Sequence, residues 1–142
     1  MIAQTRDFGE IEVSERDIIS FKQQIYGFDE YTDYVILYDE SVGDDFAWLQ
    51  SVQERDLCFL IAKPSAAVSE YKPQLPYDAV KQLGEGEYEY WLIMVVPEDI
   101  KESTVNLKSP IVLNPSQCSA VQVILEDNYP IRFRIFDERE GV

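Results

Sequence analysis

The chain has 142 residues, and its 12 basic and 27 acidic side chains give a formal net charge of −15. This charge disfavours direct contact with nucleic acid or an anionic membrane, because both are bound mainly through Lys and Arg. The chain has no histidine, which excludes Ser-His-Asp and Cys-His catalysis and any histidine-ligated zinc or iron site. The length and the 46% hydrophobic content predict a single packed domain over residues 1–142.

The two cysteines indicate neither a metal site nor a redox motif. Cys58 and Cys118 are far apart, and neither belongs to a Cys-x-x-Cys pair. Cys58 stands in an apolar run, which predicts a small buried side chain. The N-terminus lacks the apolar stretch of a signal peptide, and no segment approaches the ~20 apolar residues of a membrane span. We therefore expect a cytoplasmic protein without a membrane segment, metal or other cofactor.

The first half of the chain shows short runs of alternating or continuous apolar residues, which are typical of antiparallel β-strands. In chain order, the predicted strands are residues 10–13, 18–21, 34–38, 46–51 and 57–62. The last two of these form a predicted hairpin with its turn at residues 53–56. Pro64 ends this unit.

One helix and further strands are predicted in the second half. Tyr77, Val80 and Leu83 recur at helical spacing between Pro76 and Gly84, which predicts a helix of about two turns. The remaining predicted strands are residues 87–96, which we expect to enter the core at their C-terminal end, and residues 105–107, 111–113, 121–125 and 131–135. The fold class is therefore mainly β: an antiparallel pseudobarrel or sandwich of about nine or ten short strands with one short helix.

Acidic residues are concentrated between Asp29 and Asp56, where nine of them stand against the single base Arg55. One interpretation is a solvated face that keeps the protein soluble, and the other is a patch that attracts a basic partner. Glycoside hydrolysis would need two carboxyl groups facing each other across a cleft. The spacing of a calcium-binding loop is absent. A carboxylate-based enzyme and a bound divalent cation are thus the weaker alternatives.

The aromatic residues allow two interpretations. Trp48 and Trp91 could offer stacking surfaces to a ligand, but core packing is the favoured prediction for both. The loop Ile25–Phe28 carries three large apolar residues around Gly27. These side chains must either fold back onto the barrel or point outward to a partner.

Several motifs follow one another along the chain. They are Thr5-x-x-Phe8-Gly9-Glu10-Ile11, Phe21-x-x-x-Ile25-x-Gly27-Phe28-Asp29, Trp48-Leu49-Gln50-Ser51, Tyr71-x-Pro73, Val96-Pro97-Glu98-Asp99 and Thr104-x-Asn106-Leu107-x-x-Pro110-Ile111-Val112-x-Asn114. In this set and order the chain resembles the flagellar assembly factor FliW family over residues 5–125. It departs from the family's usual Pro-x-Gly-Leu-Pro-Gly-Phe phrase after Phe21, since Lys22 and Tyr26 replace both prolines and Gln24 replaces the first glycine.

The resemblance implies a cytoplasmic, non-catalytic bacterial regulator with a β-pseudobarrel fold. Such proteins bind CsrA, a small basic RNA-binding homodimer that represses translation, and alternatively bind flagellin. Competition between the two partners couples flagellin translation to flagellin export. Combined with the charge, this implies that docking places negative potential near the RNA phosphates on CsrA. The alternatives are a carboxylate-based enzyme of unknown substrate and a small-ligand-binding β module.

The candidate partner-binding residues combine the acids of the charged segment with two aromatic residues of the loop before it. They are Asp29, Glu30, Asp33, Asp44, Asp45, Tyr26 and Phe28.

Overall fold

The structure is a computed structural model that describes residues 1–23, 25–28 and 30–136. Within these ranges the chain forms eleven β-strands and one α-helix, which confirms the predicted mainly β fold. The helix α1 is Tyr77–Leu83. The strands are β1 Ile2–Gln4, β2 Glu10–Glu12, β3 Ile19–Phe21, β4 Asp33–Leu37, β5 Phe46–Ser51, β6 Cys58–Ala62, β7 Glu89–Val95, β8 Thr104–Val105, β9 Ile111–Asn114, β10 Ser119–Gln122 and β11 Phe133–Arg134.

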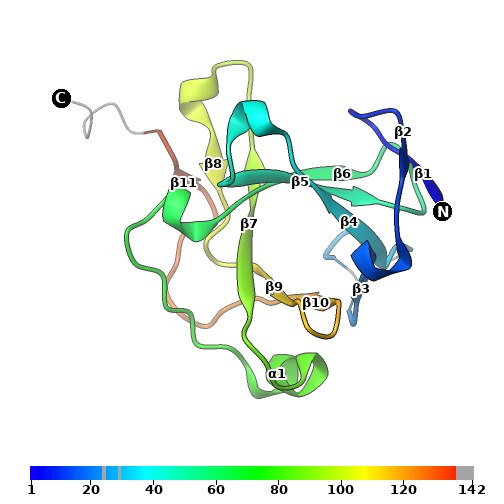
Figure 1. The fold of residues 1–142 in the computed structure, drawn as a ribbon. Coiled ribbons are helices and arrows are strands. Elements are labelled where there is room, and N and C mark those ends of the chain that lie inside the picture. The colour runs from blue at the N-terminus through cyan, green and yellow to red at the C-terminus, as the bar shows by residue number, and fades with distance from the viewer. Residues whose placement is uncertain (24, 29, 137–142) are drawn as a thin grey trace.

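Seven strands close into a barrel in the order β7-β6-β5-β4-β3-β10-β9 and back to β7 (Figure 1). Neighbouring strands are antiparallel, except that β3 and β10 are parallel. The first half of β7 pairs with β9, whereas Met94 and Val95 pair with β8. Strand β8 in turn pairs with β11, and β1 and β2 form a separate hairpin. The second half of β7 stays paired with the barrel strand β6. On its other edge its last two residues pair with β8, and with β8 and β11 they form a small flap.

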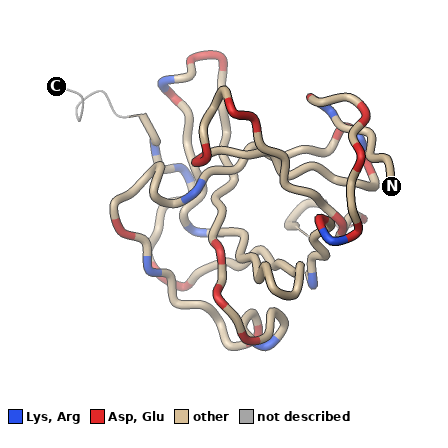
Figure 2. The backbone as a smooth tube through the Cα atoms, viewed as in Figure 1, with Lys and Arg blue, Asp and Glu red and all other residues tan. Residues whose placement is uncertain are grey.

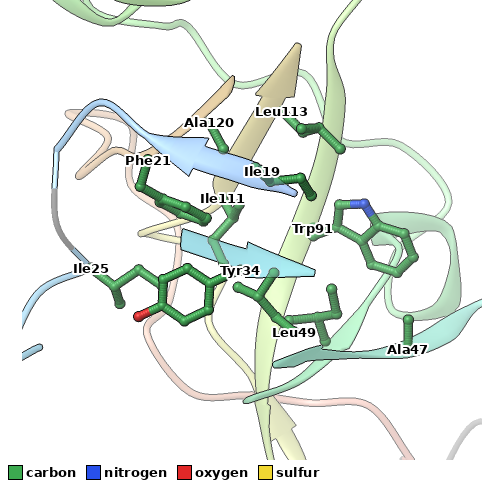
Figure 3. Packing of buried hydrophobic residues seen from close by; sticks show 11 residues of the cluster. Ile19, Phe21, Ile25, Tyr34, Ala47, Leu49, Trp91, Ile111, Leu113 and Ala120 are labelled. Atoms are coloured by element: carbon green, nitrogen blue, oxygen red, sulfur yellow. The ribbon is translucent and has the colours of Figure 1, made fainter. Parts of the chain in front are cut away.

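The barrel interior holds the main core (Figure 3). Alternate residues of each strand point inward, so Ala47 and Leu49 of β5 face Ile61 of β6 and Trp91 of β7. Trp91 is only 1% exposed, which confirms the core prediction for this residue. The predicted entry of β7 into the core at its C-terminal end is wrong, because Trp91 and Leu92 in the middle are buried while Val95 on the flap is 62% exposed.

Trp48 does not lie in the core, so the core prediction for this residue is wrong. Because Ala47 and Leu49 point into the barrel, the alternation of β5 directs Trp48 to the outer face. The indole is half-buried there, and its ring meets that of Phe8 edge to face with 5.3 Å between centroids. Trp48 therefore belongs to a surface.

The predicted helix is confirmed, but its buried face differs from the predicted one. Ala79 and Leu83 pack against the outer side of β9 and β10, while Tyr77 and Val80 are exposed. The helix ends at Gly84, whose N–H donates to the Val80 carbonyl at 2.9 Å and whose φ of +78° favours glycine. The flanking Pro76 and Gly84 thus located the helix better than its apolar spacing did.

The strand β1 was missing from the predicted elements. It pairs with β2 in a register that places Ala3 opposite Ile11, and Ala3 is buried against Val13 and Val35. A three-residue strand with one buried alanine carries too little apolar periodicity to be predicted.

Cys58 is buried in β6, as predicted, and burial raises the pKa of its thiol from 9.0 to about 11. Cys118 is half-buried, and both cysteines are free thiols. Since disulfide exchange needs a thiolate, we expect Ellman's reagent at pH 8 to modify Cys118 well before Cys58 in the folded protein. The variants Cys58→Ala and Cys118→Ala assign the two phases. Equal rates in folded protein would contradict the burial of Cys58, whereas equal rates in urea are expected.

Candidate partner-binding surface

The acidic segment is divided between the two ends of β4. Glu30 and Asp33 lie where β4 begins, beside the β5–β6 turn, while Asp44 and Asp45 lie in the loop after β4 ends. At about 3.3 Å per residue, the ends of β4 are about 13 Å apart. This exceeds the ~8 Å screening length at physiological salt. The acids therefore form two separate groups.

At the first end, the loop 25–28 partly folds back onto the barrel. Ile25 is buried in the core at 1% exposure, and the Phe28 ring meets Phe59 edge to face with 5.1 Å between centroids. Tyr26 points outward at 55% exposure, and its backbone N–H donates to Gln122 Oε1 at 3.0 Å. Both outcomes considered for this loop thus occur side by side. Asp29 lies outside the described residues.

The acids at this end lie in turns that are tied together. The Gln53 side-chain oxygen accepts the backbone N–H groups of Thr32 and Asp33 at 2.9 and 3.1 Å. Partial desolvation raises the pKa of the nearby Tyr31 phenol, and the charges of Glu30 and Glu54 raise it further. The hydrogen bonds of Gln53 thus join the β5–β6 turn to the segment in which β4 begins.

At the other end, the outer face of β5, β6 and β7 carries an apolar groove of about 320 Å³. Outward-pointing residues of the three strands line the groove, together with Val42 from the β4–β5 loop and Phe136 from the C-terminal segment. All of these side chains are apolar. The lining residues are Val42, Phe46, Trp48, Leu60, Met94 and Phe136. Val42 and Phe136 are each 42% exposed, so the groove is open to a partner.

The loop between β4 and β5, which supplies Val42 to the groove, is rich in acidic residues (Figure 2). Val42 ends the short 3₁₀ turn Glu40–Val42, and Asp45 directly precedes Phe46. Asp44 and Asp45 are exposed. We call the apolar groove and its four acids Asp39, Glu40, Asp44 and Asp45 the acid-rimmed groove.

Asp39 fixes the shape of this rim. Its carboxylate accepts the Ser41 backbone N–H at 2.9 Å and the Ser41 hydroxyl at 2.8 Å. The backbone hydrogen bond is the main cause that lowers the pKa of Asp39, so this carboxylate keeps its charge at neutral pH. An apolar floor beside fixed negative charge suits a basic partner that presents an apolar contact.

The shared motif residues mostly hold turns. The Thr5 hydroxyl donates to the Gly9 carbonyl at 2.7 Å, and Gly9 has a φ of +67°. Asn106 Oδ1 accepts two backbone N–H groups of its own turn, and Asn114 Nδ2 donates to the Leu83 carbonyl at 2.8 Å. These motifs therefore specify the barrel and its loops, and a partner surface has to be sought elsewhere.

The acid-rimmed groove includes Asp44 and Asp45 from the candidate residues, but Glu30, Asp33 and Phe28 lie at the opposite end of β4 and Tyr26 lies beside α1. Val42, Leu60, Met94 and Phe136 were not among the candidates. For Leu60 a signal existed in the continuous apolar run of residues 57–61, since a strand that is apolar on both faces must have its outer face covered or used.

The part of the chain that the structure describes contains no group of three or more Cys, Asp or Glu placed to hold a metal ion. Among the described residues, there is also no helix long and apolar enough to cross a membrane.

Comparison with known proteins gives one consistent match. The family model described as FliW protein matches residues 2–135. The flagellar assembly factor FliW of Caldicellulosiruptor bescii is 36% identical over 140 residues, covering 96% of this chain and 91% of the relative. That of Ruminiclostridium cellulolyticum is 34% identical over 142 residues, covering 97% and 96%. A crystal structure of the flagellar assembly factor FliW aligns with a TM-score of 0.87 at 32% identity, covering 98% of this chain and 99% of that one.

Proposed function

The chain belongs to the FliW family, and we propose that it is a flagellar assembly factor that binds the translational repressor CsrA and, in competition, flagellin. Under this proposal it works in the cytoplasm as a single binding domain without catalysis or cofactor. Accumulated flagellin occupies the protein and releases CsrA, which then represses flagellin translation. Export of flagellin frees the protein to bind CsrA again.

The acid-rimmed groove is the observation that supports this proposal. Its apolar floor is formed by outward-pointing strand residues that include Trp48. Such a floor offers the desolvated contact from which most binding free energy comes. Its acidic side offers the long-range attraction that speeds association with a basic dimer such as CsrA. We therefore expect the apolar floor to slow dissociation of the complex and the acids to speed its association.

Electrostatic repulsion explains how binding at this groove would weaken RNA binding. The rim acids add negative potential to the CsrA surface, and this potential acts on phosphates within about 8 to 10 Å at physiological salt. Because the coupling between two ligands is reciprocal, RNA must weaken the hold of this protein on CsrA by the same factor.

Neutralising the rim should slow association with CsrA, while neutralising the other end should not. In Asp44→Asn/Asp45→Asn and in the matched control Glu30→Gln/Asp33→Asn, two negative charges are removed with little change in volume. We expect the first pair to lower the association rate several-fold at ~50 mM salt and much less at ~300 mM salt. Stopped-flow kinetics with purified CsrA measures both rates. The four sites are not buried, so each change should alter stability by only about 0.5 kcal/mol or less.

An equal loss in both pairs, or a loss only in the control pair, would contradict the assignment of CsrA to this groove. Displacement of a short hairpin RNA at saturating protein separates the two mechanisms of antagonism. Repulsion predicts weaker displacement by the Asp44→Asn/Asp45→Asn variant, whereas full displacement would mean that the RNA is blocked sterically or by a conformational change.

A further inference from the structure

The wall of the barrel is incomplete beside the second half of β4. Strand β3 pairs with β4 only through Ile19 opposite Tyr34 and Ser20 opposite Asp33. On its other side β4 stays paired with β5 as far as Leu37 opposite Trp48. The edge of residues 35–37 that faces away from β5 therefore has no neighbouring strand among the described residues.

The backbone of Ile36 faces this open edge. The Val52 N–H donates to the Asp33 carbonyl at 3.0 Å. The backbone N–H and C=O groups of Asp33, and of every second residue after it, therefore point toward β5. The N–H and C=O of Ile36 consequently point the other way, toward the place where a longer β3 would lie. Within the described ranges neither group has a hydrogen-bond partner in the chain. An unpaired strand edge of this kind is a template for another extended chain.

A groove of about 480 Å³ runs along this edge, and its lining suits the alternating side chains of a strand. On the outside of the barrel, the groove is lined by residues of β2 and β4 and by Val13, which follows β2. On the inside it is lined by residues of the main core, and the β9–β10 turn forms the opposite wall. The apolar lining includes Ile11, Val13, Val35 and Leu37 outside and Ile19, Ile36 and Leu113 inside. A strand laid beside Ile36 would thus place one set of side chains on each apolar lining.

The charges at the groove select the occupant. Glu12 and Asp17 line it, Glu15 lies in the same 3₁₀ turn as Asp17, and Arg16 is the one base in the lining. A second copy of this chain would bring its own net charge of −15 and the same acids against them. Like charges that meet across an interface disfavour it, so self-association through this edge is opposed.

We propose that this groove binds an extended apolar segment of a partner protein, flanked by Lys or Arg, which adds to the barrel as a strand beside β4. The unpaired backbone of Ile36 selects an extended chain, the two apolar linings select its alternating side chains, and the acids select its basic flanks. The inference goes beyond the proposed function and does not depend on it, because the surface is separate from the acid-rimmed groove.

The test uses a synthetic nine-residue peptide, Lys-Lys-Val-Thr-Val-Thr-Val-Lys-Lys, titrated into the ¹⁵N-labelled protein. Strand addition predicts that the Ile36 amide shifts and exchanges with solvent more slowly, while the Val35 amide, already paired with β5, changes little. The variant Glu12→Lys/Asp17→Lys should weaken binding about fivefold to tenfold. The matched control Glu85→Lys/Glu87→Lys makes the same charge change beyond α1 and should bind as the parent does.

Three results would overturn the proposal. The first is an unchanged Ile36 amide at saturating peptide. The second is equal affinity for a peptide N-methylated at alternate residues, because such a peptide lacks the N–H groups that pair with a strand edge. The third is concentration-dependent dimerisation that occludes the peptide, which would assign the edge to a second copy of the chain.

Discussion

Replacing Trp91 by alanine is expected to lower the free energy of unfolding by about 3 to 5 kcal/mol, the usual cost of emptying a large aromatic site in a core. The indole is 1% exposed and is contacted from several sides inside the barrel. The Tyr38 ring lies 6.3 Å from it between centroids, and the Lys63 ammonium lies 5.8 Å from its ring centre. Urea denaturation followed by circular dichroism measures the change.

Trp48→Ala provides the matched comparison, since it removes the same side chain from the outer face. Trp48 is half-buried, so we expect a loss of about 1 to 2 kcal/mol. A folded Trp48→Ala variant should also bind CsrA more weakly, because Trp48 lines the acid-rimmed groove. Equal destabilisation by the two substitutions would contradict the inward and outward assignment along β5 and β7.

Gln50→Leu is expected to cost about 2 to 4 kcal/mol, because it leaves one buried and several partly buried backbone groups without their partner. The Gln50 side chain is fully buried, and its Oε1 accepts the Arg6 N–H at 3.0 Å. Its Nε2 donates to the carbonyl oxygens of Arg55 at 2.9 Å and Ser51 at 3.1 Å. This one amide therefore joins the N-terminal hairpin to the β5–β6 turn.

Gln53→Leu is the control for the Gln50 prediction. Gln53 also accepts two backbone N–H groups, but it is exposed, so water can replace the amide oxygen. We expect less than about 1 kcal/mol. Thermal denaturation of both variants measures the loss of stability that each substitution causes. A Gln50→Leu variant as stable as Gln53→Leu would show that the buried Gln50 amide is not required for stability.

Much of the fold was predictable because its signals are local. The hairpin of β5 and β6 follows from two apolar runs separated by a polar turn, and its observed strands match the predicted ranges to within one residue. Pro76 and Gly84 mark the ends of α1, because their effects depend on the backbone at their own positions. Such features require no knowledge of distant residues.

What the sequence did not predict depends on contacts between distant segments. The closure of the barrel by β7 and β9 and the parallel pairing of β3 with β10 leave no local pattern. The division of the acidic segment follows from the length of β4, and Val42 and Phe136 meet only once the flap is folded. Alternate residues of β5 point to opposite faces, so either Trp48 or its neighbours Ala47 and Leu49 had to point inward. Because all three are apolar, the sequence did not decide between the two arrangements.

Methyl NMR of the complex with CsrA tests the central claim, that the acid-rimmed groove is the docking surface, most directly. With Val, Leu and Met methyl groups labelled, saturation with CsrA should shift Val42, Leu60 and Met94, which line the groove. Leu57, at the opposite end of the β5–β6 hairpin, should stay unchanged. Unchanged groove methyls in a saturated complex, together with shifts at Leu57, would contradict the assignment and place CsrA at the other end of the barrel.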